Sequence, residues 1–121
     1  MRVDKMVTAT VAALEGIKGR DIVVLDVRRL TALFDKLIVA SGDSTRQNKA
    51  LANNVQEKLK ALGATVYGVE GADSGEWILV DLGAVVVHIM QPATRQYYNL
   101  EELWGGEAAF PQRRAAGAAR S

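Results

Sequence analysis

Residues 69–90 constrain the fold of this 121-residue chain more than any other stretch. Within them, residues 77–82 and 85–90 form two apolar runs rich in β-branched side chains, and only Gly83 and Ala84 separate the runs. Two such runs across a short glycine-containing turn predict a β-hairpin. The runs also contain a Trp, an Asp and the only His of the chain. The hairpin is therefore both a part of the predicted core and a candidate site.

Patterns elsewhere in the chain predict three helices and three further strands. Apolar residues recur at helical spacing over residues 3–15, and a second helix begins at a capping box of Ser44 and Gln47 and ends at Gly63. Pro92 suits the first turn of a third helix, which extends to about Leu103. The other predicted strands are residues 22–27, 35–40 and 64–70. This order predicts an α/β domain with a single mixed five-stranded sheet and three helices. Since three helices cannot cover both faces of such a sheet, part of one face should remain open to a partner.

Length and composition predict one domain followed by a tail. The chain is 49% hydrophobic and 24% charged, as is usual for a globular protein, and we expect the folded domain at residues 1–104. Residues 105–121 are rich in Ala, Gly and Arg without periodicity, which predicts a disordered tail. The absence of cysteine excludes disulfides and thiolate sites. Without an apolar run of membrane-spanning length or a secretory signal, the expected location is the cytoplasm.

The net charge of +1 is unevenly distributed along the chain. The predicted tail contains three arginines and one glutamate, so residues 1–104 carry a net charge of −1. Affinity for nucleic acid comes from many contacts between basic side chains and phosphates. If the protein acts on a nucleic-acid machine, its charge favours binding to a protein component of that machine.

The sequence gives little support for a catalytic site. Ser41 or Ser44 could form a triad with Asp81 and His88, but the chain has no G-x-S-x-G motif. One His and no Cys leave only carboxylates to bind a metal. The turn between the two serines resembles a phosphate-binding turn of nucleotidyltransferase folds, but no carboxylate pair follows at residues 53–55. We therefore expect no catalytic site, metal or cofactor, and keep a nucleotidyltransferase-like enzyme as the alternative.

Alternation along the hairpin assigns its side chains to two faces. The aliphatic sets should meet the helices, and the mixed sets should share the opposite face if the strands pair in the matching register. The mixed sets are Trp77, Leu79 and Asp81 in the first strand and Val86, His88 and Met90 in the second. Aromatic, apolar and polar side chains gathered on one sheet face are typical of an interface. The alternative is that His88 and Asp81 hydrogen-bond each other beneath Trp77.

These residues also match the pattern of a known family. The matching segments are D-I-V-V-L-D-V from Asp21, K-L-I-V-A-S-G from Lys36, G-V-E-G from Gly68, W-I-L-V-D-L-G from Trp77 and V-H-I-M-Q from Val87, followed by Arg95, Tyr98, Leu100, Glu101, Leu103 and Trp104. In order and spacing over residues 3–104, the chain closely resembles the ribosomal silencing factor family, also called the Iojap family. The combination G-V-E-G…W-I-x-x-D-x-G…V-H-x-M carries most of the specificity.

The resemblance implies a nucleotidyltransferase-like fold without the catalytic carboxylates. It also implies binding to protein fourteen of the large ribosomal subunit, on the face where the small subunit joins. Bound there, family members sterically block subunit joining and lower translation during starvation or stationary phase. A role in large-subunit assembly is the alternative function attached to the family. Members tend to form homodimers. The tail at residues 105–121 departs from the family pattern; its three arginines are candidates for a peripheral contact with ribosomal RNA, but a solvated chain end is the favoured interpretation.

From this resemblance and the hairpin pattern we predict which residues meet the partner. They are Trp77, Leu79, Asp81, His88, Met90, Tyr98, Glu70 and Gly71. The tryptophan is the expected buried anchor, and the leucine, methionine and tyrosine are its apolar support. The aspartate and histidine are expected to contact the partner or to orient the tryptophan. The glutamate and glycine are expected to shape the neighbouring loop.

Overall fold

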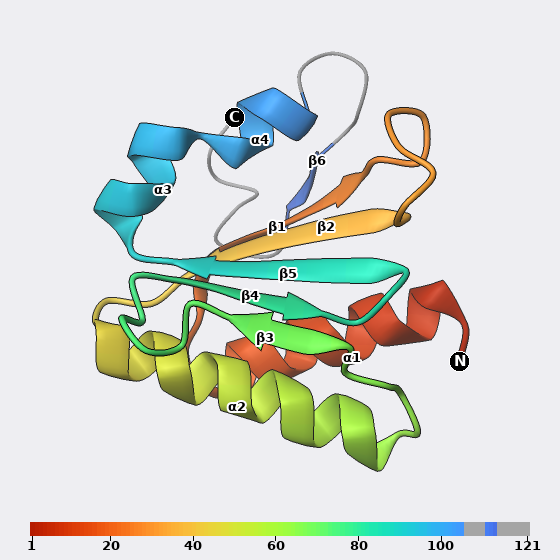
Figure 1. Ribbon diagram of the computed structural model, residues 1–121, viewed down its shortest axis with the longest axis horizontal. Coiled ribbons are helices and arrows are strands. Elements are labelled where there is room, and N and C mark those ends of the chain that lie inside the picture. Colours follow the sequence, from red (N-terminus) through yellow and green to blue (C-terminus); the bar gives the residue numbers. More distant parts are fainter. Residues whose placement is uncertain (106–110, 114–121) are drawn as a thin grey trace.

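The computed structural model describes residues 1–105 and 111–113 of the chain (Figure 1). Its elements in chain order are α1 (Val3–Gly16), β1 (Arg20–Asp26), β2 (Lys36–Ser41), α2 (Thr45–Ala61), β3 (Gly68–Glu70), β4 (Trp77–Asp81), β5 (Val85–Met90), α3 (Pro92–Tyr98), α4 (Leu100–Trp104) and β6 (Pro111–Arg113). Within these residues, no helix combines the length and apolar character needed to cross a membrane.

The strands form one mixed sheet in the order β3-β4-β5-β2-β1-β6. β2 and β5 pair in parallel, and all other neighbours pair antiparallel. The predicted hairpin is present as β4 and β5, and the Leu82 N–H donates to the Val85 carbonyl at 2.9 Å across its turn. Gly83 in that turn has a φ of +88°, which glycine adopts without steric cost. The α/β class and the mixed sheet predicted from the sequence are confirmed.

Two long helices, α1 and α2, cover one face of the sheet (Figure 1). The aliphatic residues of β4 and β5 lie in this core, as their alternation predicted. Leu14 of α1 and Leu51 and Leu59 of α2 are fully buried there. The Ser44 hydroxyl accepts the Gln47 N–H at 3.0 Å, so α2 begins at the predicted cap. This face is a closed, aliphatic core.

The opposite face carries a smaller apolar cluster, over which α3 and α4 lie. Leu25, Val39 and Met90 of the sheet are fully buried in this cluster, and Leu100 of α4 is 7% exposed there. Four residues packed against it are only partly buried: Phe34, Trp77, Leu79 and Trp104. The short helices therefore leave part of this face accessible, as three helices on such a sheet led us to expect.

Two elements are shorter or more broken than the sequence predicted. The third strand begins at Gly68 rather than at residue 64. The predicted last helix is divided into α3 and α4 by Asn99, which adopts a left-handed conformation with a φ of 51°. Asparagine tolerates this conformation because its side chain can hydrogen-bond locally. Here its amide donates to the Glu102 carboxylate at 2.9 Å.

A sixth strand, β6, lies in the segment that the sequence predicted as a disordered tail. It pairs antiparallel with β1, with Val23 opposite Arg113. Three residues are too few to show strand periodicity, and an open edge such as that of β1 accepts an added strand through its backbone groups. The rest of the predicted tail, including the side chains of its arginines, lies outside the described residues.

Candidate interaction surface

The register of the β4–β5 hairpin brings the two mixed sets of side chains onto one face. Trp77 pairs with Met90, Leu79 with His88, and Asp81 with Val86. Residues directly opposite each other in an antiparallel pair point to the same side of the sheet. The matching register that the sequence analysis required is therefore present.

The centre of this face is a hydrogen bond between the indole of Trp77 and the imidazole of His88. The indole N–H donates to Nδ1 of His88 at 2.8 Å, and the two ring centroids lie 5.8 Å apart. His88 is only 8% exposed, and burial lowers its pKa to about 4. The imidazole is thus neutral at physiological pH, which is the state in which Nδ1 can accept this bond. His88 orients the tryptophan.

The alternative pairing of His88 with Asp81 is wrong. Asp81 lies half-buried at the end of β4, where its carboxylate accepts the Gly83 N–H at 2.8 Å. It closes the hairpin turn, and its carboxylate makes no other hydrogen bond or ion pair with any residue that the structure describes.

Two tyrosines of α3 continue the series of ring contacts from Trp77 toward the solvent. The Tyr98 ring packs against Trp77 at a centroid distance of 4.8 Å, and Tyr97 meets Tyr98 edge-on at 4.9 Å. Exposure rises along this series, to 53% for Tyr98 and 82% for Tyr97. We call these four residues the aromatic row: His88, Trp77, Tyr98 and Tyr97. Its inner end is buried and hydrogen-bonded, and its outer end is in solvent.

The other predicted contact residues surround the aromatic row in different ways. Met90 is fully buried and is the strand partner of Trp77. Leu79 is half-buried, and the exposed Glu70 pairs with it on the edge strand β3. Gly71 has a φ of +85°, and a Cβ there would collide with the Trp77 carbonyl. The structure thus brings the predicted residues together, with Met90 and Gly71 as supports.

Sequence reasoning did not identify the outer part of this surface. Tyr97 forms the end of the aromatic row, and the signal that could have found it is its adjacency to Tyr98, since neighbouring helical residues diverge by about 100°. Leu33, in the loop between β1 and β2, is 85% exposed, and Leu103 of α4 is 72% exposed. Phe34 and Trp104 beside them pack together at 5.4 Å. Phe34 and Trp104 both pack against the cluster on the partly open face, and the exposed leucines are their neighbours in the sequence.

The residues considered for catalysis have separate structural partners. The Ser41 hydroxyl accepts from Arg95, and the Ser44 hydroxyl caps α2. His88 is bonded to Trp77, so no serine–histidine–aspartate arrangement is formed by these residues. No cluster of three or more His, Asp or Glu side chains suited to a metal occurs in residues 1–105 and 111–113.

Comparison with known proteins identifies the family. The sequence profile of the family described as "Ribosomal silencing factor during starvation" matches residues 1–120. The chain belongs to the ribosomal silencing factor family. A ribosomal silencing factor of Chromobacterium violaceum is 56% identical over 107 residues, which are 88% of each protein. The mouse protein named mitochondrial assembly of ribosomal large subunit protein 1 is 35% identical over 97 residues, covering 78% of this chain and 42% of the mouse protein.

A solved crystal structure also resembles this chain in three dimensions. The crystal structure of a Chromobacterium violaceum protein superposes with a TM-score of 0.86 at 52% sequence identity. The match covers 98% of this chain and 97% of that one. At such identity and coverage, this chain and the Chromobacterium violaceum protein share one fold.

Proposed function

We propose that this chain is a translational repressor that binds protein fourteen of the large ribosomal subunit and sterically blocks joining of the small subunit. The observation that carries the proposal is the aromatic row on the partly open sheet face of a ribosomal silencing factor. The mechanism needs only occupancy of the joining surface. It therefore requires no catalytic residue and no cofactor, and it places the protein in the cytoplasm with the ribosomes.

The aromatic row has the features of a binding hot spot. Trp and Tyr are enriched among the residues that dominate interface energies, and they lose little side-chain entropy on binding. Trp77 is already held from below by His88 and from the side by Tyr98. A side chain fixed before binding avoids part of the ordering cost of association. The indole edge, the Tyr98 ring and Leu79 would form the apolar centre of the contact.

The remaining predicted contact residues take supporting roles in this proposal. His88 acts through Trp77, because it is nearly buried, and Met90 supports this surface as the buried strand partner of Trp77. Asp81 and Glu70 lie at the margin, where half-exposed or exposed carboxylates can pair with basic groups of the partner. Gly71 permits the tight turn that leads into Trp77. We assign the contact to residues 1–104, and we keep the homodimer of the free protein and a peripheral RNA contact of the tail arginines as parts of the proposal.

The proposal is tested by sedimenting large subunits with the purified protein and then adding small subunits. The wild-type chain should travel with the large subunit and reduce the yield of joined ribosomes. Trp77→Ala should weaken binding by about 2 kcal/mol or more, roughly 30-fold, because a central aromatic anchor is lost. Leu62→Ala is a matched control, since Leu62 is an exposed apolar residue at the end of α2, on the helix-covered side. Unchanged co-sedimentation of the folded Trp77 variant would rule out this surface.

A role in assembly of the large subunit is the second candidate, and the name of the mouse relative favours it. The two functions differ in what accumulates when the protein is removed from growing cells. Loss of an assembly factor leaves incomplete large-subunit particles during growth. Loss of a repressor leaves normal particles and raises the joined fraction during starvation.

A further inference from the structure

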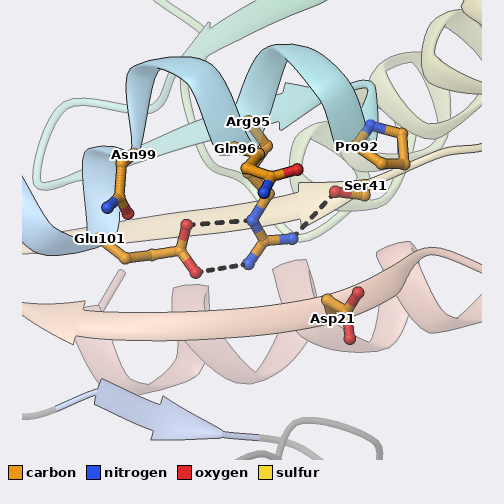
Figure 2. A pocket seen from close by; sticks show the side chains of 7 residues that line it. All are labelled: Asp21, Ser41, Pro92, Arg95, Gln96, Asn99 and Glu101. Carbon is orange, nitrogen blue, oxygen red and sulfur yellow. Dashed lines mark hydrogen bonds and ion pairs between the residues drawn. The ribbon is translucent and has the colours of Figure 1, made fainter.

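A cavity of about 330 Å³ lies beside α3 (Figure 2), and no residue of the aromatic row is among its lining residues. Ser41, the last residue of β2, and Pro92, the first residue of α3, are among its lining residues. β2 and β5 run in parallel, and Ser41 pairs with Met90 where both strands end. In open α/β sheets, ligands characteristically bind beyond the carboxyl ends of parallel strands. The cavity occupies such a position.

Arg95 forms one wall of this cavity and is held rigidly there. Its Nε and Nη2 donate to the two carboxylate oxygens of Glu101 at 3.1 and 3.0 Å, and its Nη1 donates to the Ser41 hydroxyl at 3.0 Å (Figure 2). Arg95 is only 7% exposed. A guanidinium has five N–H groups, so one on Nη1 and one on Nη2 remain without a hydrogen bond to the described residues. Buried donors of this kind favour a ligand that supplies an acceptor.

Asp21 lines the cavity from β1, opposite the α3–α4 segment that carries Arg95 (Figure 2). It has a φ of +50°, and the pairing of β1 with β2 shifts register between Arg20 and Val23. Bulges of this kind redirect side chains and recur beside functional sites. The Asp21 carboxylate makes no hydrogen bond or ion pair with any residue in the described part of the chain. It is a negative charge available to a ligand.

We propose that this cavity binds a small zwitterion of the α-amino-acid type. The ligand ammonium would pair with Asp21, and its carboxylate would accept the two remaining N–H groups of Arg95. Gln96 and Asn99, which also line the cavity, supply amide groups for the ligand side chain. A volume of about 330 Å³ is at the lower end of the range for ligand pockets, which suits a molecule of this size.

The charges of the lining residues exclude the simpler ligand classes. A plain anion would face the carboxylate of Asp21, which has no partner among the described residues. A plain cation would face the donor edge of Arg95. Glu101 already neutralises the charge of Arg95, so the remaining charge of the lining residues is that of Asp21. The two N–H groups of Arg95 that remain on Nη1 and Nη2 are the donors available to a ligand. A small ligand that carries both an ammonium and an acceptor satisfies both walls.

Titration of the full chain with single amino acids, followed by amide NMR shifts and calorimetry, tests the proposal. At least one amino acid should bind with a Kd of about 10 mM or tighter and shift the amides of Ser41 and Gln96. Acetate supplies the carboxylate alone, and glycine methyl ester supplies the ammonium alone. Each should bind at least about tenfold more weakly than the best amino acid. Equal binding of either probe, or no binding of any amino acid, overturns the proposal.

A pair of matched variants then locates the site. Asp21→Asn removes the charge and keeps a residue that tolerates the left-handed conformation, so the fold is retained. It should weaken binding of the amino acid at least about tenfold. Asp73→Asn makes the same change on an exposed loop outside the cavity and should leave binding unchanged. Wild-type affinity in Asp21→Asn, or equal losses in both variants, contradicts the assignment.

Discussion

The two faces of the β4–β5 hairpin are made by the same eleven residues of strand, yet they differ in chemistry and in closure. On one face Ile78, Val80, Val87 and Ile89 are fully buried under α1 and α2. On the other face Trp77 and Leu79 remain half-buried beside a short, broken helical segment. The first face therefore supplies stability, and the second presents preordered side chains to a partner. Substitutions on the two faces should therefore affect stability and binding to different degrees.

The largest expected effect is on the closed face. Leu51→Ala should lower the free energy of unfolding by about 3 kcal/mol, because Leu51 is fully buried and its loss leaves a cavity between α2 and the sheet. Urea unfolding followed by circular dichroism measures the change. Leu103→Ala, an equal truncation at an exposed residue of the open face, should cost less than about 0.5 kcal/mol. Equal losses in the two variants would break the distinction between the faces.

The second effect is the pH dependence that His88 gives to the open face. His88 has a pKa of about 4 in the folded protein, against an ordinary value of 6.5. Between these values the unfolded chain binds a proton that the folded protein does not. The free energy of unfolding should therefore fall as the pH falls from 6.5 toward 4, by roughly 3 kcal/mol in total. Urea unfolding at a series of pH values measures the slope.

His88→Asn is the control for this slope, because an amide can accept the indole N–H without titrating. Its stability should change much less between pH 6.5 and 4. Asp26 contributes little to the change in unfolding free energy over this pH range. Its hydrogen bond with Arg28 and the charge of Lys36 lower its pKa below the ordinary 3.8. The stability that Asp26 contributes is present above that ordinary value and is lost only at more acidic pH. A slope that persists unchanged in the His88 variant would mean that another group is responsible.

The sequence predicted the face of each hairpin residue but not the partner of His88. Period-2 alternation and a two-residue turn determine which side chains share a face. Trp77 and Asp81 are both diagonal neighbours of His88 in the β4–β5 register, so spacing alone could not choose between them. Side-chain length decides, because an indole can reach a diagonal neighbour and a carboxylate cannot. The short Asp81 side chain bonds the Gly83 N–H instead.

The cavity beside α3 could not be predicted from the sequence, for a different reason. Its central contacts join Arg95 to Ser41, which is 54 residues away, and to Glu101 across the helix break at Asn99. Periodicity over residues 92–103 predicts one continuous helix, in which this arrangement of Arg95 and Glu101 would not arise. The helix break at Asn99 therefore separates the Arg95–Glu101 contact of the structure from the arrangement that the sequence predicted.

The smallest effect on stability is expected at the outer end of the aromatic row. Tyr97 is 82% exposed and contacts the row through the edge of Tyr98, so Tyr97→Ala should change the free energy of unfolding by less than about 0.5 kcal/mol. Binding to the large subunit should nevertheless weaken by about 1 kcal/mol, roughly fivefold, because a tyrosine at an interface contributes through its ring. Tyr97→Phe keeps that ring and should bind like the wild type. If the alanine variant binds equally well, the contact ends at Tyr98, and the open face contributes less to recognition than its exposed aromatic area implies.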